Sequence, residues 1–348
     1  MPPRLPLVTV TTSTGAIAIA DMLSASAATQ AMYAAVRLGI PDVLAAGPAS
    51  APHVAAGVAA DPESTHRLLR ALVAAGVCEQ REGHTFALTG VGDQLRTGVE
   101  GSMRAYVLHW AGSMWPVWAQ LFHHVKTGSN PRALVTRRSP FESLAGRPGS
   151  EQVFHQAMSE MAALAGASIV EAYTFSPGSV VVDVGGGQGA LIASVLASTP
   201  GLRGVLFDQA SAVEGAERAL GARGVIDRCD VVVGNFFDQV PQNGDVYLLK
   251  SVLHDWDDTA AGAILNRIAG AMSDEARLLI VERVLPDQLS TSARDRVAVG
   301  SDILMMLAAG GRERTVTEFD GLLESAGLRR LRIIETPMHY SIIEAGRG

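Results

Sequence analysis

From residue 177 onward, short apolar runs alternate with longer segments of helical periodicity, and this alternation limits the fold more than any other feature of the chain. The runs are Val180–Val184, Gly204–Phe207, Val231–Val233, Val246–Leu249 and Leu278–Val281. Apolar strands that alternate with helices are typical of a parallel sheet covered on both faces. Two later runs, Leu331–Ile334 and Tyr340–Ile343, predict an antiparallel hairpin. We therefore expect an α/β domain with a doubly wound, mostly parallel sheet over residues 177–348.

The first hundred residues have a different pattern, which is mainly helical. Asp61 followed by Pro62 predicts a helix start, because aspartate can cap the first turn and proline fits its first position. A short helix over 52–59 precedes this start, and Glu79–Leu88 predicts a hairpin after it. Helix, helix and hairpin in this order predict a winged-helix-like domain over residues 1–100. We expect residues 101–176 to form a helical linker and part of a substrate pocket.

A winged helix suggests a DNA-binding regulator, but the charge of the chain opposes that hypothesis. Between Ser50 and Glu100 the chain has four basic residues against six acidic ones, and its net charge is −7. Affinity for nucleic acid requires clustered positive charge, so we expect no nucleic-acid partner. No apolar run is long enough for a membrane span, so we expect no membrane partner. The two distant cysteines, Cys78 and Cys229, favour a reducing cytoplasm over a disulfide or zinc framework.

The first predicted strand ends in a glycine-rich turn that includes Gly185, Gly187 and Gly189. Without side chains, such a backbone can approach a ligand closely, and the next helix begins directly after it. The second strand ends at Asp208, about 20 residues further on, where a carboxylate can bind ribose hydroxyls. These features fit a dinucleotide site or a methyl-donor site, and a sharp turn with a solvated aspartate is the alternative. The glycine spacing differs from G-x-G-x-x-G, which disfavours a nicotinamide-dependent dehydrogenase.

Two further strand ends carry side chains suited to an adenosine ligand. Asn235 and Phe236 follow the third strand, where an amide and a ring suit the edge and face of a purine. A turn with a core phenylalanine is the alternative. Lys250, one of only two lysines in the chain, closes the fourth strand. It either contacts a ligand or extends its charge into solvent.

His254 lies four residues beyond Lys250 and is the candidate general base. Its ordinary pKa near 6.5 suits proton transfer near neutral pH. Glu282 closes the fifth strand, and Glu313 lies in a loop before a predicted helix. Either carboxylate could orient the imidazole, as in a catalytic triad. The alternatives are an ion pair of Glu282 with its neighbouring arginine and an exposed loop charge at Glu313.

Asp255, Asp257 and Asp258 form an acidic cluster directly after His254. Three carboxylates of this kind could bind Mg²⁺. Adjacent acids before a helix more often serve as caps and as partners of the helix dipole. We therefore expect no bound metal.

Together these motifs resemble one enzyme family. They are Val181–Gly189, Asp208, Gly234–Phe237, Lys250–Trp256 and Gly310–Thr315, with Phe154–Ser159 as a further helix motif. The family is the S-adenosylmethionine-dependent O-methyltransferases of the plant caffeate and bacterial polyketide type, and the resemblance covers about residues 25–345. It implies methyl transfer from S-adenosylmethionine to a hydroxyl of a small aromatic or polyketide-like acceptor, with S-adenosylhomocysteine as product and no metal. It also implies a homodimer formed through the N-terminal domain.

The resemblance further implies roles for individual residues. It makes His254 the general base, with Glu282, Glu313 and Asp255 beside it. The residues implied to bind the methyl donor are Asp183, Gly185, Gly187, Asp208, Asn235, Phe236, Lys250, Ser251 and Trp256. The residues implied to line the acceptor pocket are Phe154, Met158, Met161 and Trp256.

Two positions depart from the pattern of the family. Asn235 stands where many relatives have an acid, which weakens the expected contact with adenine. Met161 and Ala162 stand where relatives have polar residues, which favours a more apolar acceptor. Some relatives keep the donor site but hydroxylate or decarboxylate, so a non-methylating relative and a regulatory sensor stay open as alternatives. The presence of His254 favours methylation.

Overall fold

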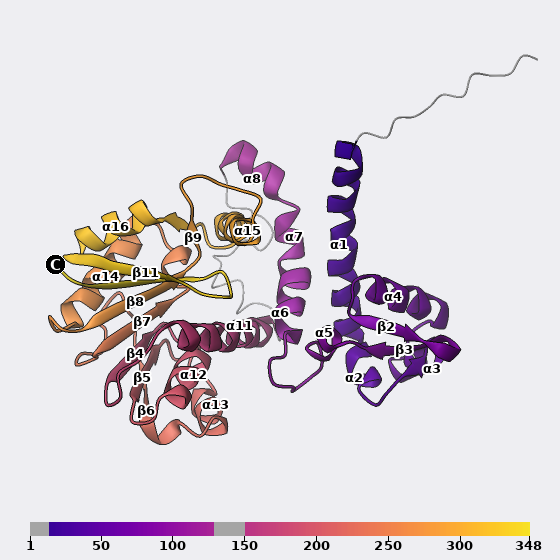
Figure 1. Ribbon diagram of the computed structural model, residues 1–348, viewed down its shortest axis with the longest axis horizontal. Helices are drawn as coiled ribbons and strands as arrows, with labels where there is room; N and C mark the ends of the chain where they lie inside the picture. Colours follow the sequence, from indigo (N-terminus) through magenta and orange to yellow (C-terminus); the bar gives the residue numbers. More distant parts are fainter. Residues whose placement is uncertain (1–13, 129–149) are drawn as a thin grey trace, which may run out of the picture. The chain divides into compact units, whose positions relative to one another are not determined.

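The computed structural model describes residues 14–128 and 150–348. The chain divides into two compact units, Met1–Ala111 and Gly112–Gly348 (Figure 1). The division falls within the helical segment 101–176.

The N-terminal unit is mainly helical and contains one small sheet. Its elements are α1 (Thr14–Leu38), α2 (Ile40–Leu44), β1 (Ala49–Ser50), α3 (Ala51–Gly57), α4 (Pro62–Ala74), β2 (Cys78–Arg81), β3 (Thr85–Leu88), α5 (Gly90–Asp93) and α6 (Arg104–Leu108). The three strands pair antiparallel in the order β1-β3-β2. Helix α4 begins where the sequence predicts, because Asp61 Oδ1 accepts a hydrogen bond from the Ser64 N–H at 2.8 Å. The predicted order of helix, helix and hairpin is confirmed.

The C-terminal unit contains a seven-stranded sheet in the order β11-β12-β8-β7-β4-β5-β6. Its parallel strands are β4 (Val180–Val184), β5 (Arg203–Asp208), β6 (Cys229–Val233), β7 (Val246–Lys250) and β8 (Arg277–Glu282). The antiparallel strands β11 (Leu328–Glu335) and β12 (Ser341–Arg347) form a hairpin beside β8. The predicted mostly parallel sheet is confirmed. The strand order turns back between β4 and β7, and ligands bind at such switch points in doubly wound folds.

Helices cover both faces of this sheet. One face packs on α11 (Ser150–Ala172), α12 (Ala190–Ser198) and α13 (Ala216–Ala222), and the other packs on α14 (Asp258–Ala271) and α16 (Val316–Ser325) (Figure 1). Successive residues of a strand point to opposite faces, so Leu248 joins the first core and Leu249 joins the second. Burial on both faces explains why the strands are continuous apolar runs.

The C-terminal unit also contains α7 (Trp115–Trp118), α8 (Leu121–Thr127), β9 (Val284–Leu285), α15 (Ala293–Ala308), β10 (Arg314–Thr315) and two 3₁₀ turns, at Ile226–Arg228 and Leu253–Asp255. Helix α15 packs against α7 through Leu307 and Ala308, and β10 pairs with β9 in parallel. In the described part of the chain, no helix has the length and apolar character needed to cross a membrane.

Candidate active site

The predicted site residues follow the carboxyl ends of the parallel strands. Asp208 ends β5, Asn235 follows β6, Lys250 ends β7, and Glu282 ends β8. The glycine turn follows β4 in the middle of this row. Because the strands are parallel neighbours, their carboxyl ends meet at one edge of the sheet. This is the edge at which doubly wound folds bind ligands.

The glycine turn after β4 packs closely against the protein on one side and is open at Gly187. A Cβ on Gly185 would lie 2.9 Å from a methyl carbon of Val252, and a Cβ on Gly186 would lie 2.6 Å from Asp183 Oδ2. Gly187 has a φ of +57°, and a Cβ there would meet nothing within 4 Å. The backbone at Gly187 can therefore be approached closely by a ligand.

Two carboxylates lie beside the glycine turn. Asp208 accepts hydrogen bonds from the Gly187 N–H at 2.8 Å and from the Gln209 N–H at 2.7 Å, which ties the turn to β5. Asp183 is buried, and its Oδ2 has no hydrogen-bond partner among the described residues. Burial and the charge of Asp208 raise the pKa of Asp183 to about 7. A buried carboxylate oxygen without a donor suits a ligand that brings an N–H or O–H group or a positive charge.

Three aromatic rings gather next to this turn. The Trp256 ring centroid lies 4.9 Å from that of Phe237 and 6.2 Å from that of Phe236. Phe236 Cε1 would be 3.8 Å from a Cβ on Gly185, so the Phe236 ring borders the glycine turn. Asn235 Oδ1 accepts a hydrogen bond from the Phe237 N–H at 3.0 Å, which leaves the amide NH₂ as its remaining donor.

Lys250, the last residue of β7, lies against the ring of a buried tyrosine, Tyr340. Its Nζ is 5.3 Å from the centroid of the Tyr340 ring, and the Arg283 guanidinium lies 4.5 Å from the same centroid. Burial by itself would raise the pKa of Tyr340, but Lys250 and Arg283 lower it below its ordinary value of 10. The next residue, Ser251, has a φ of +53°, a left-handed conformation that turns the chain out of the strand toward His254.

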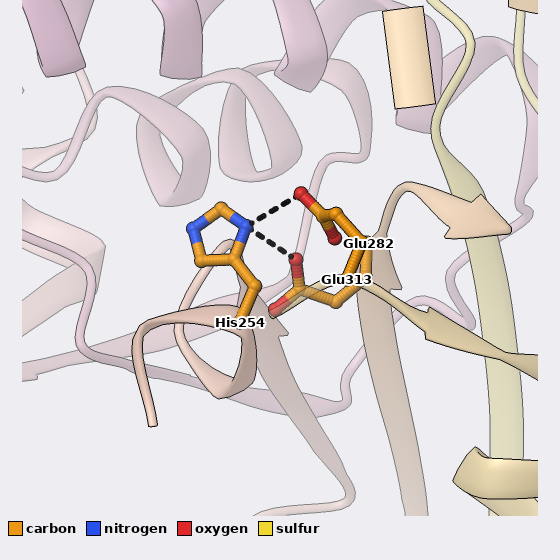
Figure 2. A group of neighbouring side chains, drawn as sticks. All are labelled: His254, Glu282 and Glu313. Carbon is orange, nitrogen blue, oxygen red and sulfur yellow. Dashed lines mark hydrogen bonds and ion pairs between the residues drawn. The ribbon is translucent and has the colours of Figure 1, made fainter. Parts of the chain in front are cut away.

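One nitrogen of the His254 ring points toward the carboxylates of two glutamates, as Figure 2 shows. Its Nδ1 is 3.0 Å from Glu313 Oε1 and 3.3 Å from Glu282 Oε2. Carboxylates accept hydrogen bonds, so Nδ1 carries the proton that faces them. The other ring nitrogen, Nε2, lies 3.8 Å from Asp255 Oδ1, at the distance of an ion pair. The imidazole is 8% exposed, so it is almost fully removed from water.

Both glutamates are held by further hydrogen bonds. Glu282 Oε1 accepts the N–H groups of Val252 and Leu253, each at 3.0 Å. Glu313 Oε1 accepts a hydrogen bond from the Ser301 hydroxyl at 2.6 Å, and the Glu313 N–H donates to Asp302 Oδ1 at 2.9 Å. The alternatives of an ion pair to a neighbouring arginine and of an exposed loop charge do not describe these glutamates, which are 0% and 1% exposed.

The carboxylates set the protonation of the imidazole. Burial lowers the pKa of His254, but Glu282, Glu313 and Asp255 more than offset this effect and raise the pKa from 6.5 to about 10. Burial raises the pKa of Glu282 to about 7, against the opposing charge of His254. Burial also raises the pKa of Asp255. The resting imidazole therefore holds its proton firmly, and the cluster favours positive charge at this point of the site.

Among the described residues, His254, Glu282 and Glu313 form a cluster of the residue types that can bind a metal ion. One atom each of His254, Glu282 and Glu313 lie within 4.8 Å of one another. The distances from His254 Nδ1 to the carboxylates are those of hydrogen bonds and ion pairs, which a shared proton accounts for.

The acidic residues after His254 serve mainly as local structure. Asp257 caps α14, because its Oδ1 accepts a hydrogen bond from the Ala260 N–H at 2.8 Å. Asp258 pairs with the guanidinium of Arg314 at 2.8 Å. The expectation that acids before this helix act as caps is confirmed at Asp257.

The predicted acceptor residues share one helix. Phe154, Met158 and Met161 lie on α11 at positions i, i+4 and i+7, which places them on one helix face. Met161 is buried, whereas Phe154 and Met158 are half-buried. Their role toward an acceptor stays a prediction.

The sequence did not single out three residues that the structure connects to His254. Ser301 and Asp302 lie on α15 and bind Glu313, and Arg314 binds the loop that carries His254. Polar residues on a helix and arginine in a charged loop normally face solvent, so their types gave no signal of burial. The only sequence signal for Arg314 was its position directly after Glu313.

Comparison with known proteins agrees with this geometry. Residues 118–329 match a family model described as the O-methyltransferase domain, and residues 20–98 match the O-methyltransferase dimerisation domain. The chain belongs to the O-methyltransferase family. The resemblance inferred from the strand-end motifs is thereby confirmed.

Three known relatives show the range of this family. The O-methyltransferase described here is 38% identical over 315 residues to O-demethylpuromycin-O-methyltransferase of Streptomyces alboniger, covering 89% of this chain and 84% of the relative. It is 33% identical over 319 residues to 8-amino-8-demethylriboflavin N,N-dimethyltransferase of Streptomyces davaonensis, covering 90% of each chain. The crystal structure of an O-methyltransferase from neocarzinostatin biosynthesis, in complex with S-adenosylmethionine and 2-hydroxy-5-methyl naphthoic acid, superposes with a TM-score of 0.73 at 31% identity, covering 92% of this chain and 96% of the other.

Proposed function

We propose that this O-methyltransferase transfers a methyl group from S-adenosylmethionine to the hydroxyl of a small aromatic or polyketide-like acceptor, with His254 as general base. The observation that carries the proposal is the position of His254, whose Nδ1 faces two buried carboxylates. In the neutral imidazole the remaining proton is held at Nδ1 by these carboxylates, so Nε2 is the nitrogen that can receive the acceptor's proton. Glu282 and Glu313 orient the ring and stabilise the imidazolium that forms, and Asp255 lies beside Nε2.

The edge of the sheet fits the methyl donor. When bound, S-adenosylmethionine supplies a methyl group attached to a positively charged sulfur. Asp183 and Asp208 give the site two carboxylates, and Asp183 Oδ2 lacks a donor among the described residues. We assign to the donor the residues that meet beside the glycine turn, namely Asp183, Gly185, Gly187, Asp208, Asn235, Phe236, Lys250, Ser251 and Trp256.

The base strength of His254 suits a phenolic acceptor. A phenol has an ordinary pKa near 10, and the carboxylates raise the pKa of His254 to about 10. A proton is then shared between the two groups at nearly equal free energy. Aromatic amines, on which the riboflavin relative acts by its name, are already nucleophilic without loss of a proton. The buried base therefore favours a hydroxyl acceptor over an amine.

The acceptor site is proposed to be apolar and free of metal. Phe154, Met158 and Met161 lie on one face of α11 and, with Trp256, give rings and thioethers suited to an aromatic molecule. Because His254 removes the proton and the methyl group arrives activated, the reaction has no step that requires a metal ion.

The N-terminal unit supports a homodimer. It matches a dimerisation domain, and Ile19, Met22 and Leu23 on α1 are 61%, 75% and 70% exposed. The chain is acidic, so we propose no nucleic-acid partner. Cys78 and Cys229 are buried and free, which supports a reducing cytoplasm as the location.

The experiment that tests the proposed function is an activity screen in the presence of EDTA. Purified protein is incubated with S-adenosylmethionine and matched pairs of acceptors that carry either a phenolic hydroxyl or an aromatic amine. We expect S-adenosylhomocysteine and a methylated phenol to form together, with EDTA having no effect. Methylation of amines alone, or activity that EDTA removes and a divalent cation restores, would contradict the proposal.

A further inference from the structure

The fully buried arginine at position 314 lies next to the loop that carries His254. Arg314 is 0% exposed. Its Nη1 donates to Leu253 O at 2.9 Å, its Nη2 donates to Trp256 O at 2.8 Å, and its Nε donates to Asp258 Oδ1 at 2.9 Å. One guanidinium thus binds the carbonyls on both sides of His254 and the carboxylate at the start of α14.

We infer that Arg314 is a positioning residue for the general base: it holds the turn 253–256 so that Nδ1 of His254 keeps facing its two glutamates. The inference rests on the proposed role of His254 as the base. Arg314 touches neither the imidazole nor any reacting atom in the contacts described, so it acts through the backbone of this turn.

Two charged side chains bind the backbone of the turn 253–256. One accepts hydrogen bonds from its N–H groups, and the other donates hydrogen bonds to its carbonyls. Glu282 accepts the N–H groups of Val252 and Leu253, whereas Arg314 donates to the carbonyls of Leu253 and Trp256. A turn of one 3₁₀ step leaves most of its backbone groups without partners of its own. Glu282 and Arg314 supply hydrogen-bond partners for these backbone groups. They therefore fix the position of the turn at the edge of the sheet.

The neighbouring backbone of the same loop also contacts this turn. The Arg312 N–H donates to His254 O at 2.9 Å. A Cβ on Gly311 would lie 2.0 Å from the same oxygen and 2.6 Å from the carbonyl carbon of Asp255. Gly311 is therefore required for the loop to approach this closely, and its replacement by alanine must push the two segments apart.

Because Arg314 directly follows Glu313, it links the position of His254 to the position of the Glu313 carboxylate. Glu313, which faces Nδ1, and Arg314, which holds the turn, are adjacent in the chain. A shift of the turn relative to the 311–314 segment would change the distance from Nδ1 to Glu313. Lysine could not replace the arginine, because it is a single point donor, whereas the guanidinium presents its N–H groups in a fixed plane to all three acceptors.

The test compares Arg314→Lys and Arg314→Met with Arg330→Lys. Arg330 is the matched control, because its guanidinium also binds a carboxylate, that of Asp320, but lies on β11 with a side chain that is 33% exposed. The readouts are kcat, the affinity for S-adenosylhomocysteine by calorimetry, and the titration midpoint of His254 by NMR of ¹⁵N-histidine-labelled enzyme. General loss of structure would lower kcat and the affinity for S-adenosylhomocysteine together, whereas a displaced base lowers kcat and moves the midpoint while this affinity is kept.

We expect kcat to fall by about 10- to 100-fold in Arg314→Lys, since displacing a catalytic group by about 1 Å has effects of this order. The affinity for S-adenosylhomocysteine should stay within about twofold of wild type. A change in the position of the base alters the chemical step, and therefore kcat, without altering the contacts that bind this product. The His254 midpoint should move down toward 6.5 as the imidazole leaves its carboxylates. Gly311→Ala should change the same readouts in the same direction, and Arg330→Lys should change none of them.

Two results would overturn the inference. One is an Arg314→Lys enzyme with wild-type kcat and an unmoved His254 midpoint. The other is a fall in kcat matched by an equal fall in S-adenosylhomocysteine affinity, which would mean general loss of structure. Should Arg314→Met fail to fold, Arg314→Lys and Gly311→Ala decide. If His254→Ala proved fully active, the proposed role of His254 as the base would be wrong, while the midpoint in Arg314→Lys would still report whether Arg314 positions the imidazole.

Discussion

Glu282 holds His254 from two directions. Its Oε1 accepts the two N–H groups that begin the turn, and its Oε2 lies 3.3 Å from His254 Nδ1. One carboxylate therefore contacts both the backbone that carries the imidazole and the ring itself. Because β8 buries Glu282 completely, water does not compete for either oxygen.

Glu282→Gln should slow methyl transfer and lower the pKa of His254. Glutamine can still accept the two N–H groups, but it removes the charge that contributes most to the raised pKa of the imidazole. A fall in kcat on the order of 100-fold is expected, because loss of the carboxylate in a triad removes the correct tautomer. The pH–rate profile should shift to lower pH. The control is Glu335→Gln, whose side chain is 74% exposed, and a Glu282→Gln profile that coincided with wild type would contradict the role.

The wild-type rate should rise with pH through neutrality. The neutral imidazole is the base, and the pKa of His254 is raised to about 10, so its neutral fraction grows as the pH approaches that value. Stability should change in the opposite sense. The stabilisation that comes from the raised pKa of His254 is fully present below its ordinary pKa of 6.5 and is lost as the pH rises through about 10.

Both trends can be measured on the same preparation. The value of kcat/KM for the methyl donor is recorded at saturating acceptor from about pH 6 to 10, and the free energy of unfolding by urea is recorded over the same range. A rate that stayed constant across neutral pH, together with unchanged stability, would show that the imidazole is not held by its carboxylates.

Gly186→Ala should impair donor binding. Its Cβ would lie 2.6 Å from Asp183 Oδ2 and 2.5 Å from Leu206 Cδ1, so the turn or the end of β5 must move. Overpacking of this kind costs about 1–3 kcal/mol of stability. Calorimetry with S-adenosylhomocysteine should show at least about tenfold weaker binding, which is 1.4 kcal/mol. Gly221→Ala, in open space on α13, should bind as wild type. If Gly186→Ala and Gly221→Ala bound S-adenosylhomocysteine equally well, the glycine turn would not be part of the donor site.

Met22→Glu should separate the proposed homodimer. Met22 is 75% exposed on α1, beside the equally exposed Leu23, and a charge in an apolar interface leaves a buried ion without a partner. Sedimentation at micromolar concentration should show a dimer for wild type and a monomer for the variant. Val91→Glu, at an exposed apolar position on α5, is the control and should stay dimeric. A wild-type monomer would exclude the dimer, and a dimeric Met22→Glu protein would exclude this face of α1.

Buried strands were the part of the fold that the sequence predicted best. Val180–Val184 was placed without error, because continuous burial on both faces gives a continuous apolar run. The edge strand β11 was placed over Leu331–Ile334 but extends over Leu328–Glu335. Arg329 and Arg330 interrupt its apolar pattern, which an exposed edge strand tolerates.

The candidate site divides in a similar way. Glu282 and Glu313 could be proposed from their places after a strand and in a loop, since strand ends of parallel sheets meet at one edge. Ser301 and Arg314 could not, because their burial depends on how α15 and the 311–314 segment pack onto that edge. The division of the chain after Ala111 likewise depends on packing between helices of similar periodicity.

The most direct test of the proposed mechanism is the rate of methyl transfer by His254→Ala in a single turnover, measured together with its affinity for S-adenosylhomocysteine. We expect the rate to fall by about 100- to 10,000-fold, the usual contribution of a general base, with affinity for S-adenosylhomocysteine unchanged. His123→Ala, at an exposed position on α8, should transfer the methyl group at the wild-type rate. A His254→Ala enzyme that kept the full rate at every pH would contradict the assignment of His254 as the base.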